Sequence, residues 1–126
     1  MRILLDTHLI LWWLDGSALL PVMAKELIED SENAVFVSAV SLWEIWLKQS
    51  LGKLRLPPEF EEKLGVESFE NLPLTAAQTR RVADLPWLHR DPFDRMLVAQ
   101  ALADDVTLLT ADEVLAGYGG CVLVAR

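Results

Sequence analysis

The sequence has little cysteine and no long hydrophobic run. Its one cysteine, Cys121, excludes an internal disulfide and a cysteine-based zinc site, and the surrounding run CVLVA predicts a buried thiol without a chemical role. The apolar stretches fall far short of the roughly 20 residues that a membrane span needs, and MRILLDTH reaches an aspartate too early for a signal peptide. With 126 residues, 52% of them hydrophobic, we expect one soluble, cytoplasmic domain over residues 1–126 with no membrane partner.

Positive charge is also scarce. Eleven basic residues stand against nineteen acidic ones, which leaves a formal charge of −8 and argues against binding nucleic acid by overall attraction. The objection weakens if several carboxylates gather around divalent cations, because the ions then reverse the local sign where a phosphate approaches. The arrangement of the acids therefore decides the functional class.

Short apolar segments alternate with helical ones along the chain. Strands are expected at 2–5, 34–37, 106–109 and 121–125, with a weak one within 66–74. Helices are expected at 7–16, 21–32, 38–52, 57–65, 75–85, 91–105 and 110–117. Apolar strands separated by helices predict an α/β fold, a three-layer sandwich with a central, mostly parallel sheet flanked by helices on both sides.

Several helix boundaries carry specific capping signals. Ser38 is expected to cap the helix that follows it, and Thr75 with Gln78 forms a capping-box pattern. Asp91 is expected as an N-cap with Pro92 at the first helical position, so this helix is the clearest in the sequence.

Acidic residues stand where the predicted strands end. Asp6 closes the first strand, Thr110 and Asp112 follow the fourth, and Asp94 lies in the first turn of a helix. Ligands of open parallel sheets bind beyond the carboxyl ends of the strands, so these side chains are expected to converge. Asp94 and Asp112 also fit as ordinary first-turn acids, and Asp91 as a simple N-cap, so this alternative stays open.

Glu44 is the most informative of the acids. It lies in VSLWEIWL, where apolar residues surround the helix on nearly every side and predict burial. A buried lone carboxylate is costly unless a cation or hydrogen-bond donors compensate it. Lys48, one turn later, offers an ordinary ion pair; a metal ion is the other candidate partner.

Four converging carboxylates would repel one another unless hard cations lay between them. Oxygen-only ligands suit Mg²⁺ or Mn²⁺. Such ions polarise phosphoryl oxygens and activate a water for in-line attack, so the arrangement indicates phosphodiester hydrolysis.

The strings LLDTH, SAVSLWEIWLKQSLGKL, HRDPFDRMLVAQA and LLTAD, in this order, resemble the PIN-domain ribonucleases, specifically the VapC-type toxins of type II toxin–antitoxin systems. The resemblance spans nearly the whole chain. It implies a PIN-domain fold, endonucleolytic cleavage of RNA, a homodimer, and neutralisation by a small VapB-like antitoxin. It also implies that the catalytic, metal-binding acids are Asp6, Glu44, Asp94 and Asp112, with Thr110 and Asp91 in supporting positions.

Basic residues near these acids are candidates for contacting RNA. Each is as readily a solvated surface charge. The candidates flank the third acid or follow the helix that carries Glu44: Arg90, Arg95, Lys48, Lys53 and Arg55. His8 and His89 offer proton transfer, although a structural role is commoner and a metal-bound water needs no histidine base.

Five tryptophans are many for a chain of this length. Trp12 and Trp13 are adjacent, so at least one should lie near the surface, in a dimer contact or an antitoxin groove. Trp43 and Trp46 are expected in the core.

Three alternative functions remain to be weighed. A phosphoacceptor receiver domain has a similar length and clustered aspartates, but it needs a late lysine, and none follows Lys63. A haloacid-dehalogenase-like phosphatase would have an aspartate two positions after Asp6, where His8 stands. A catalytically idle PIN-like interaction module is the third; the complete acidic set disfavours it.

Overall fold

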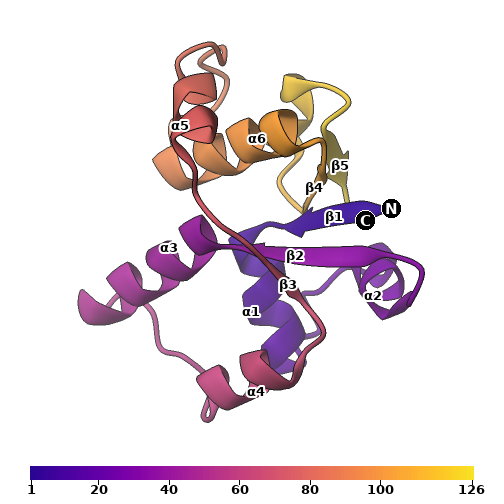
Figure 1. The fold of residues 1–126 in the computed structure, drawn as a ribbon. Helices are drawn as coiled ribbons and strands as arrows, with labels where there is room; N and C mark the ends of the chain where they lie inside the picture. Colours follow the sequence, from indigo (N-terminus) through magenta and orange to yellow (C-terminus); the bar gives the residue numbers. More distant parts are fainter.

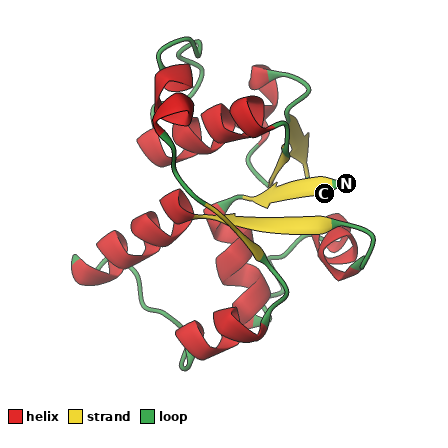
Figure 2. Cartoon of the chain, viewed as in Figure 1, coloured by secondary structure: helices red, strands yellow, loops and turns green.

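A computed structural model describes residues 1–126 as one five-stranded sheet with helices on both faces (Figures 1 and 2). The strand order is β3-β2-β1-β4-β5, and every neighbouring pair is parallel. The strands are β1 (Arg2–Leu5), β2 (Ala34–Ser38), β3 (Glu70–Leu72), β4 (Thr107–Thr110) and β5 (Val122–Val124). The helices are α1 (Thr7–Asp15), α2 (Val22–Glu29), α3 (Ala39–Ser50), α4 (Phe60–Val66), α5 (Ala76–Val82), α6 (Pro92–Asp104) and the 3₁₀ helix η1 (Glu113–Tyr118). The predicted α/β three-layer sandwich is confirmed, with a sheet that is parallel throughout.

Two hydrophobic cores lie on opposite faces of the sheet. Successive strand residues point to opposite faces, so Ile3 and Leu5 of β1 pack with α1, α2 and α4, whereas Leu4 packs with α5 and α6. Each of these three side chains is fully buried, which fixes β1 at the centre of the sheet. Cys121 is free and only half-buried, so its thiol is less buried than the sequence predicts.

Local capping signals set the helix starts as predicted. The Ser38 hydroxyl accepts a hydrogen bond of 2.9 Å from the backbone N–H of Val40. Thr75 and Gln78 form the complete capping box. Asp91 accepts from the first-turn N–H groups of α6, with Pro92 at the first helical position. These rules require only neighbouring residues, which explains their success.

Several helix bounds differ from the prediction by two or more residues. α3 ends at Ser50 rather than Gly52, and α5 ends at Val82 rather than Leu85. α2 ends at Glu29, because Asp30 adopts an extended conformation. α4 begins after Glu59 rather than at Pro57, since a residue that precedes proline is driven out of the helical region, and α4 runs one residue past Gly65. The last helix is of the 3₁₀ type.

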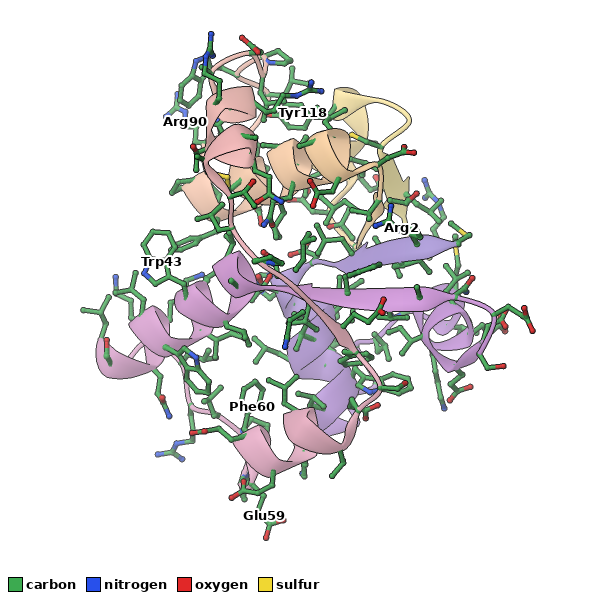
Figure 3. All side chains as sticks on the ribbon, viewed as in Figure 1. Arg2, Trp43, Glu59, Phe60, Arg90 and Tyr118 are labelled. Atoms are coloured by element: carbon green, nitrogen blue, oxygen red, sulfur yellow. The ribbon has the colours of Figure 1, made fainter.

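The tryptophans are more exposed than the sequence indicates. Trp43 is 58% exposed, so its predicted core position is wrong; α3 extends beyond the sheet, and this part of its surface has no layer above it (Figures 1 and 3). Its ring packs edge-on against Phe93, with centroids 4.9 Å apart. Trp46 does pack against the core, on Phe60. Both adjacent tryptophans, Trp12 and Trp13, are half-buried.

Parallel strands bring their carboxyl ends to one edge of the sheet, which is where α1 and α3 begin (Figure 1). Ser38, at the end of β2, donates a 2.5 Å hydrogen bond to buried Gln100 of α6 and so ties the start of α3 to the opposite helical layer. None of the helices combines the length and the apolar character needed to cross a bilayer.

Candidate active site

Asp6 lies at the centre of this edge. It directly follows β1, is 4% exposed, and its backbone N–H donates to the carbonyl of Leu109 at 3.0 Å. The Thr110 hydroxyl, at the end of the neighbouring strand β4, donates to Asp6 Oδ2 at 2.5 Å and accepts from the backbone N–H of Asp112 at 3.0 Å. Asp6 Oδ1 is buried and has no hydrogen-bond partner. One oxygen of this carboxylate is therefore fixed and the other is left without compensation.

Glu44 shows the same division between its two oxygens. It is 3% exposed on α3, and its Oε2 accepts from Lys48 Nζ at 2.5 Å. This hydrogen bond raises the pKa of the Lys48 ammonium. Glu44 Oε1 is buried without a partner. The ordinary ion pair considered for Glu44 is thus present, yet it satisfies only half of the carboxylate.

Asp94 and Asp112 come together around His89. One ligand atom from each of the three residues lies within 4.8 Å of the others. His89 Nε2 is 3.0 Å from Asp112 Oδ2 and 3.5 Å from Asp94 Oδ2. His89 Nδ1 accepts from the backbone N–H of Asp91 at 3.0 Å, which leaves the proton on Nε2, where it can be donated to the carboxylates.

Negative charge accumulates at this edge of the sheet. Burial raises the pKa of Asp94 to about 7, and the charges of Asp6 and Asp91 add to the rise. Burial also raises the pKa of Asp6, against the lowering effect of the hydrogen bond from Thr110, and the charge of Glu44 raises it further. The carboxyl groups lie close enough to oppose one another's ionisation.

The donor set fits a divalent cation. Two buried carboxylate oxygens, Asp6 Oδ1 and Glu44 Oε1, have no partner, and an unpaired buried acceptor is costly. The raised pKa of the third acid, Asp94, shows that this carboxyl group resists ionisation when no cation is bound. A hard cation with oxygen ligands would compensate all three, and Asp112 lies within reach of Asp94 to complete the set.

Arg95 is buried, although its place beside Asp94 predicts a surface position. Its side chain is 3% exposed, and its guanidinium donates to the carbonyl of Pro86 at 2.9 Å, the hydroxyl of Tyr118 at 3.1 Å and the carbonyl of Val82 at 3.3 Å. The guanidinium also lies 3.8 Å from the ring centroid of Trp87. The interpretation of Arg95 as an RNA contact is therefore wrong; this residue holds the loop before α6 against the domain.

Three of the other basic candidates share one surface. Lys48, Lys53 and Arg55 line a cleft of about 370 Å³ beside Glu44. His8 lines the same cleft and does not contact the acids through a hydrogen bond or ion pair. Arg90 is exposed on the loop before α6 and points away from the domain (Figure 3).

The sequence offers His8 and His89 equally as candidates for proton transfer, and it gives no sign of a role for Tyr118. The Tyr118 hydroxyl accepts from the backbone N–H of His89 at 3.2 Å and from Arg95, so it supports the loop that carries the imidazole. The only sequence signal for His89 was its place two residues before the N-cap Asp91.

Comparison with known proteins agrees with this fold. The family model described as "PIN domain" matches residues 3–120. No curated protein sequence matches the chain. A chain in the crystal structure of VapBC2 from Rickettsia felis, bound to a DNA fragment from its promoter, superposes with a TM-score of 0.70 at 17% identity, covering 98% of this chain and 97% of that one. A domain of a functionally unknown protein from Methanocaldococcus jannaschii gives a TM-score of 0.58 at 18% identity, with 99% and 91% coverage.

Proposed function

The chain belongs to the PIN-domain family, and on this premise we propose that it is a metal-dependent endoribonuclease, the toxin of a toxin–antitoxin pair. PIN domains are generally nucleases. One observation carries the proposal: buried, unpartnered oxygens on Asp6 and Glu44 lie at the edge of the sheet where Asp94 resists ionisation. Such an arrangement is unfavourable in a purely structural role and favourable around a divalent cation.

The four acids Asp6, Glu44, Asp94 and Asp112 would hold Mg²⁺ or Mn²⁺. Bound there, the cation supplies Lewis-acid polarisation of the phosphoryl oxygen and lowers the pKa of a water, so that water can attack phosphorus in line. The protein supplies the placement of the ligands. Thr110 fixes Asp6 Oδ2 and leaves Oδ1 for the site.

The remaining supports act on the other two acids. Asp91 accepts hydrogen bonds from the N–H groups of Phe93 and Asp94 and so fixes the first turn of α6. His89, held by Asp91, donates toward Asp112 and keeps that carboxylate beside Asp94. Ligand orientation by such outer contacts typically changes metal affinity about 10–100-fold.

RNA backbone contacts are assigned to the basic side chains at the surface. Lys48, Lys53 and Arg55 line the same cleft as Glu44, so they can contact the backbone of an RNA strand bound at the acids. Arg90, exposed ahead of α6, is retained as a candidate on the other side. The acidic chain as a whole repels RNA, so binding is expected to depend on the cation and on these few residues.

The test is cleavage of total RNA by the purified chain, free of any partner, with Mg²⁺ or Mn²⁺. We expect cleavage that chelator abolishes and that Asp94→Asn reduces at least about 100-fold. Asp84→Asn makes the same chemical change at an exposed ion pair outside the site and should cleave like wild type.

Two other outcomes of this cleavage assay would contradict the proposal. A catalytically idle interaction module would leave RNA intact with either metal. Cleavage that persists equally in Asp94→Asn or in chelator would remove the metal-dependent mechanism.

A small VapB-like antitoxin is the proposed partner, supported by the similarity to a chain of the Rickettsia felis VapBC2 complex. Expression of the chain alone should arrest growth of a host, and Asp94→Asn should not. Co-expression of a short neighbouring reading frame with a DNA-binding fold should relieve the arrest. We also propose a homodimer, for which light scattering should give twice the monomer mass.

A further inference from the structure

A cleft lies beside Glu44, at the same edge of the sheet as the acidic residues. It lies between α1, α3 and the segment that leads to α4, and its volume of about 370 Å³ falls in the range of ligand sites, ~300–1,000 Å³. Thr7, which follows Asp6, and Glu44 both line it, so the cleft opens directly next to the acids. A molecule that occupied it would therefore lie beside Glu44.

The charge of the cleft is opposite to that of the chain. Lys48, Lys53 and Arg55 line it against Asp15 and Glu44, in a protein of formal charge −8. Lys48 is paired with Glu44, whereas the side chains of Lys53 and Arg55 form no ion pair within the molecule. Two cations are therefore available for an anionic ligand.

An aromatic surface forms the opposite side. His8 and Trp12 lie one turn apart on α1, with ring centroids 5.7 Å apart and planes inclined by 36°, and both line the cleft. His8 is exposed and Trp12 half-buried, so part of this ring pair remains open to a ligand. Aromatic rings beside lysine and arginine are the combination that binds single-stranded nucleic acid, because rings stack on bases while cations meet phosphates.

We propose that this cleft binds one unpaired nucleotide of the RNA strand, next to the phosphate held at the acids. The base lies against His8 and Trp12, and the flanking phosphate is bound by Lys53 and Arg55. The proposal rests on the proposed nuclease function. It selects single-stranded RNA, because a base within a duplex is stacked on both faces and cannot offer one to a protein ring.

The test measures RNA binding without cleavage. A labelled, short, mixed-sequence single-stranded oligoribonucleotide is titrated against the chain carrying Asp94→Asn in Mn²⁺, at several salt concentrations. Adding Lys53→Ala and Arg55→Ala should weaken binding at least about 10-fold and make the slope of log K against log[salt] shallower by about 0.7, the contribution of the one phosphate that these two residues bind on a single strand. Adding Trp12→Leu should weaken binding by roughly 10-fold with the salt slope unchanged, because stacking releases no counterions.

The matched control is Lys63→Ala with Arg81→Ala in the same background. It removes the same charge from residues that do not line the cleft, and neither residue is ion-paired. It should leave the salt slope unchanged. If the control and the cleft variants behave alike, the proposal is wrong. It is also overturned if the cleft substitutions spare RNA binding and weaken only the binding of an antitoxin, because the cleft is then a protein-binding surface.

Kinetics separate this proposal from the nuclease function. With Asp94 intact, Lys53→Ala and Arg55→Ala should raise KM for single-stranded RNA and leave kcat near wild type, as expected for uniform binding. Unchanged KM overturns the proposal even if the wild type cleaves RNA. If the wild type cleaves no RNA, the nuclease function fails, and the salt slopes still decide whether the cleft binds a nucleotide.

Discussion

Asp94→Asn should abolish activity and at the same time stabilise the protein in the absence of metal. Burial and neighbouring carboxylates raise the pKa of Asp94 to about 7, from an ordinary value of 3.8. The folded chain therefore keeps a proton that the unfolded chain releases between about pH 4 and pH 7. Over this window the stability of the metal-free wild type falls as pH rises, and above it the loss is constant. The amide cannot ionise, so the variant escapes this loss.

The expected gain in the free energy of unfolding of Asp94→Asn can be worked out from the pKa shift of Asp94. About three pKa units correspond to at most roughly 4 kcal/mol. The Asp94 side chain keeps 15% exposure, and its favourable position in the first turn of α6 is lost, so about 1–2 kcal/mol is the expected net gain at pH 8. With an unfolding entropy of about 2.1 cal/mol/K per residue over 126 residues, Tm should rise by roughly 4–8 °C.

Urea unfolding followed by circular dichroism, in EDTA at pH 5 and pH 8, measures this difference. The gap between variant and wild type should widen from pH 5 to pH 8, while Asp84→Asn should show no such change. Saturating Mn²⁺ should reverse the order, because the wild type, with all four carboxylates, gains more from binding than the variant. A variant that is no more stable than wild type at pH 8, or equally favoured at both pH values, would refute the electrostatic argument.

Substitutions at three further residues test individual contacts. Arg95→Met should destabilise the fold by about 2–4 kcal/mol in urea unfolding, since it removes the three hydrogen bonds that the buried guanidinium donates; a loss near zero would mean that the guanidinium is exposed in solution. Thr110→Val should weaken Mn²⁺ binding about 10-fold by calorimetry, with the fold retained, because Asp6 Oδ2 loses its hydrogen bond; equal affinity would argue against orientation by the hydroxyl. His89→Ala should weaken Mn²⁺ binding by a similar factor by freeing Asp112, and His89→Gln should restore part of it; tighter binding in both would show that the imidazole competes with the metal.

Local rules explain which features the sequence predicted. The N-cap Asp91 and the capping box of Thr75 involve residues within one helical turn, so their geometry follows from neighbouring side chains. The position of Asp6 could also be predicted from the sequence, because the end of a strand in a parallel sheet determines where the next residue lies.

Features set by distant parts of the chain could not be predicted in the same way. Arg95 follows an acid in a helix and reads as a surface charge, but the loop of Pro86 and Trp87 folds over it and supplies acceptors. Trp43 lies in a helix that is apolar on nearly every side, and only the reach of α3 beyond the sheet exposes it. The contact of His89 with Asp112 depends on the path of the same loop.

The pairing of β1 with β4 also determines how activity can arise during folding. Leu5 is in register with Leu109, so Asp6 and Thr110 become neighbours only after a loop of about a hundred residues has closed. No isolated hairpin or helix pair contains the acidic cluster, and such distant contacts form slowly. Metal binding should therefore appear with the final phase of refolding, and a nick in an exposed loop that lets the two halves separate should abolish it. A chain whose chemistry exists only in the completed fold is inert at every earlier stage of its synthesis.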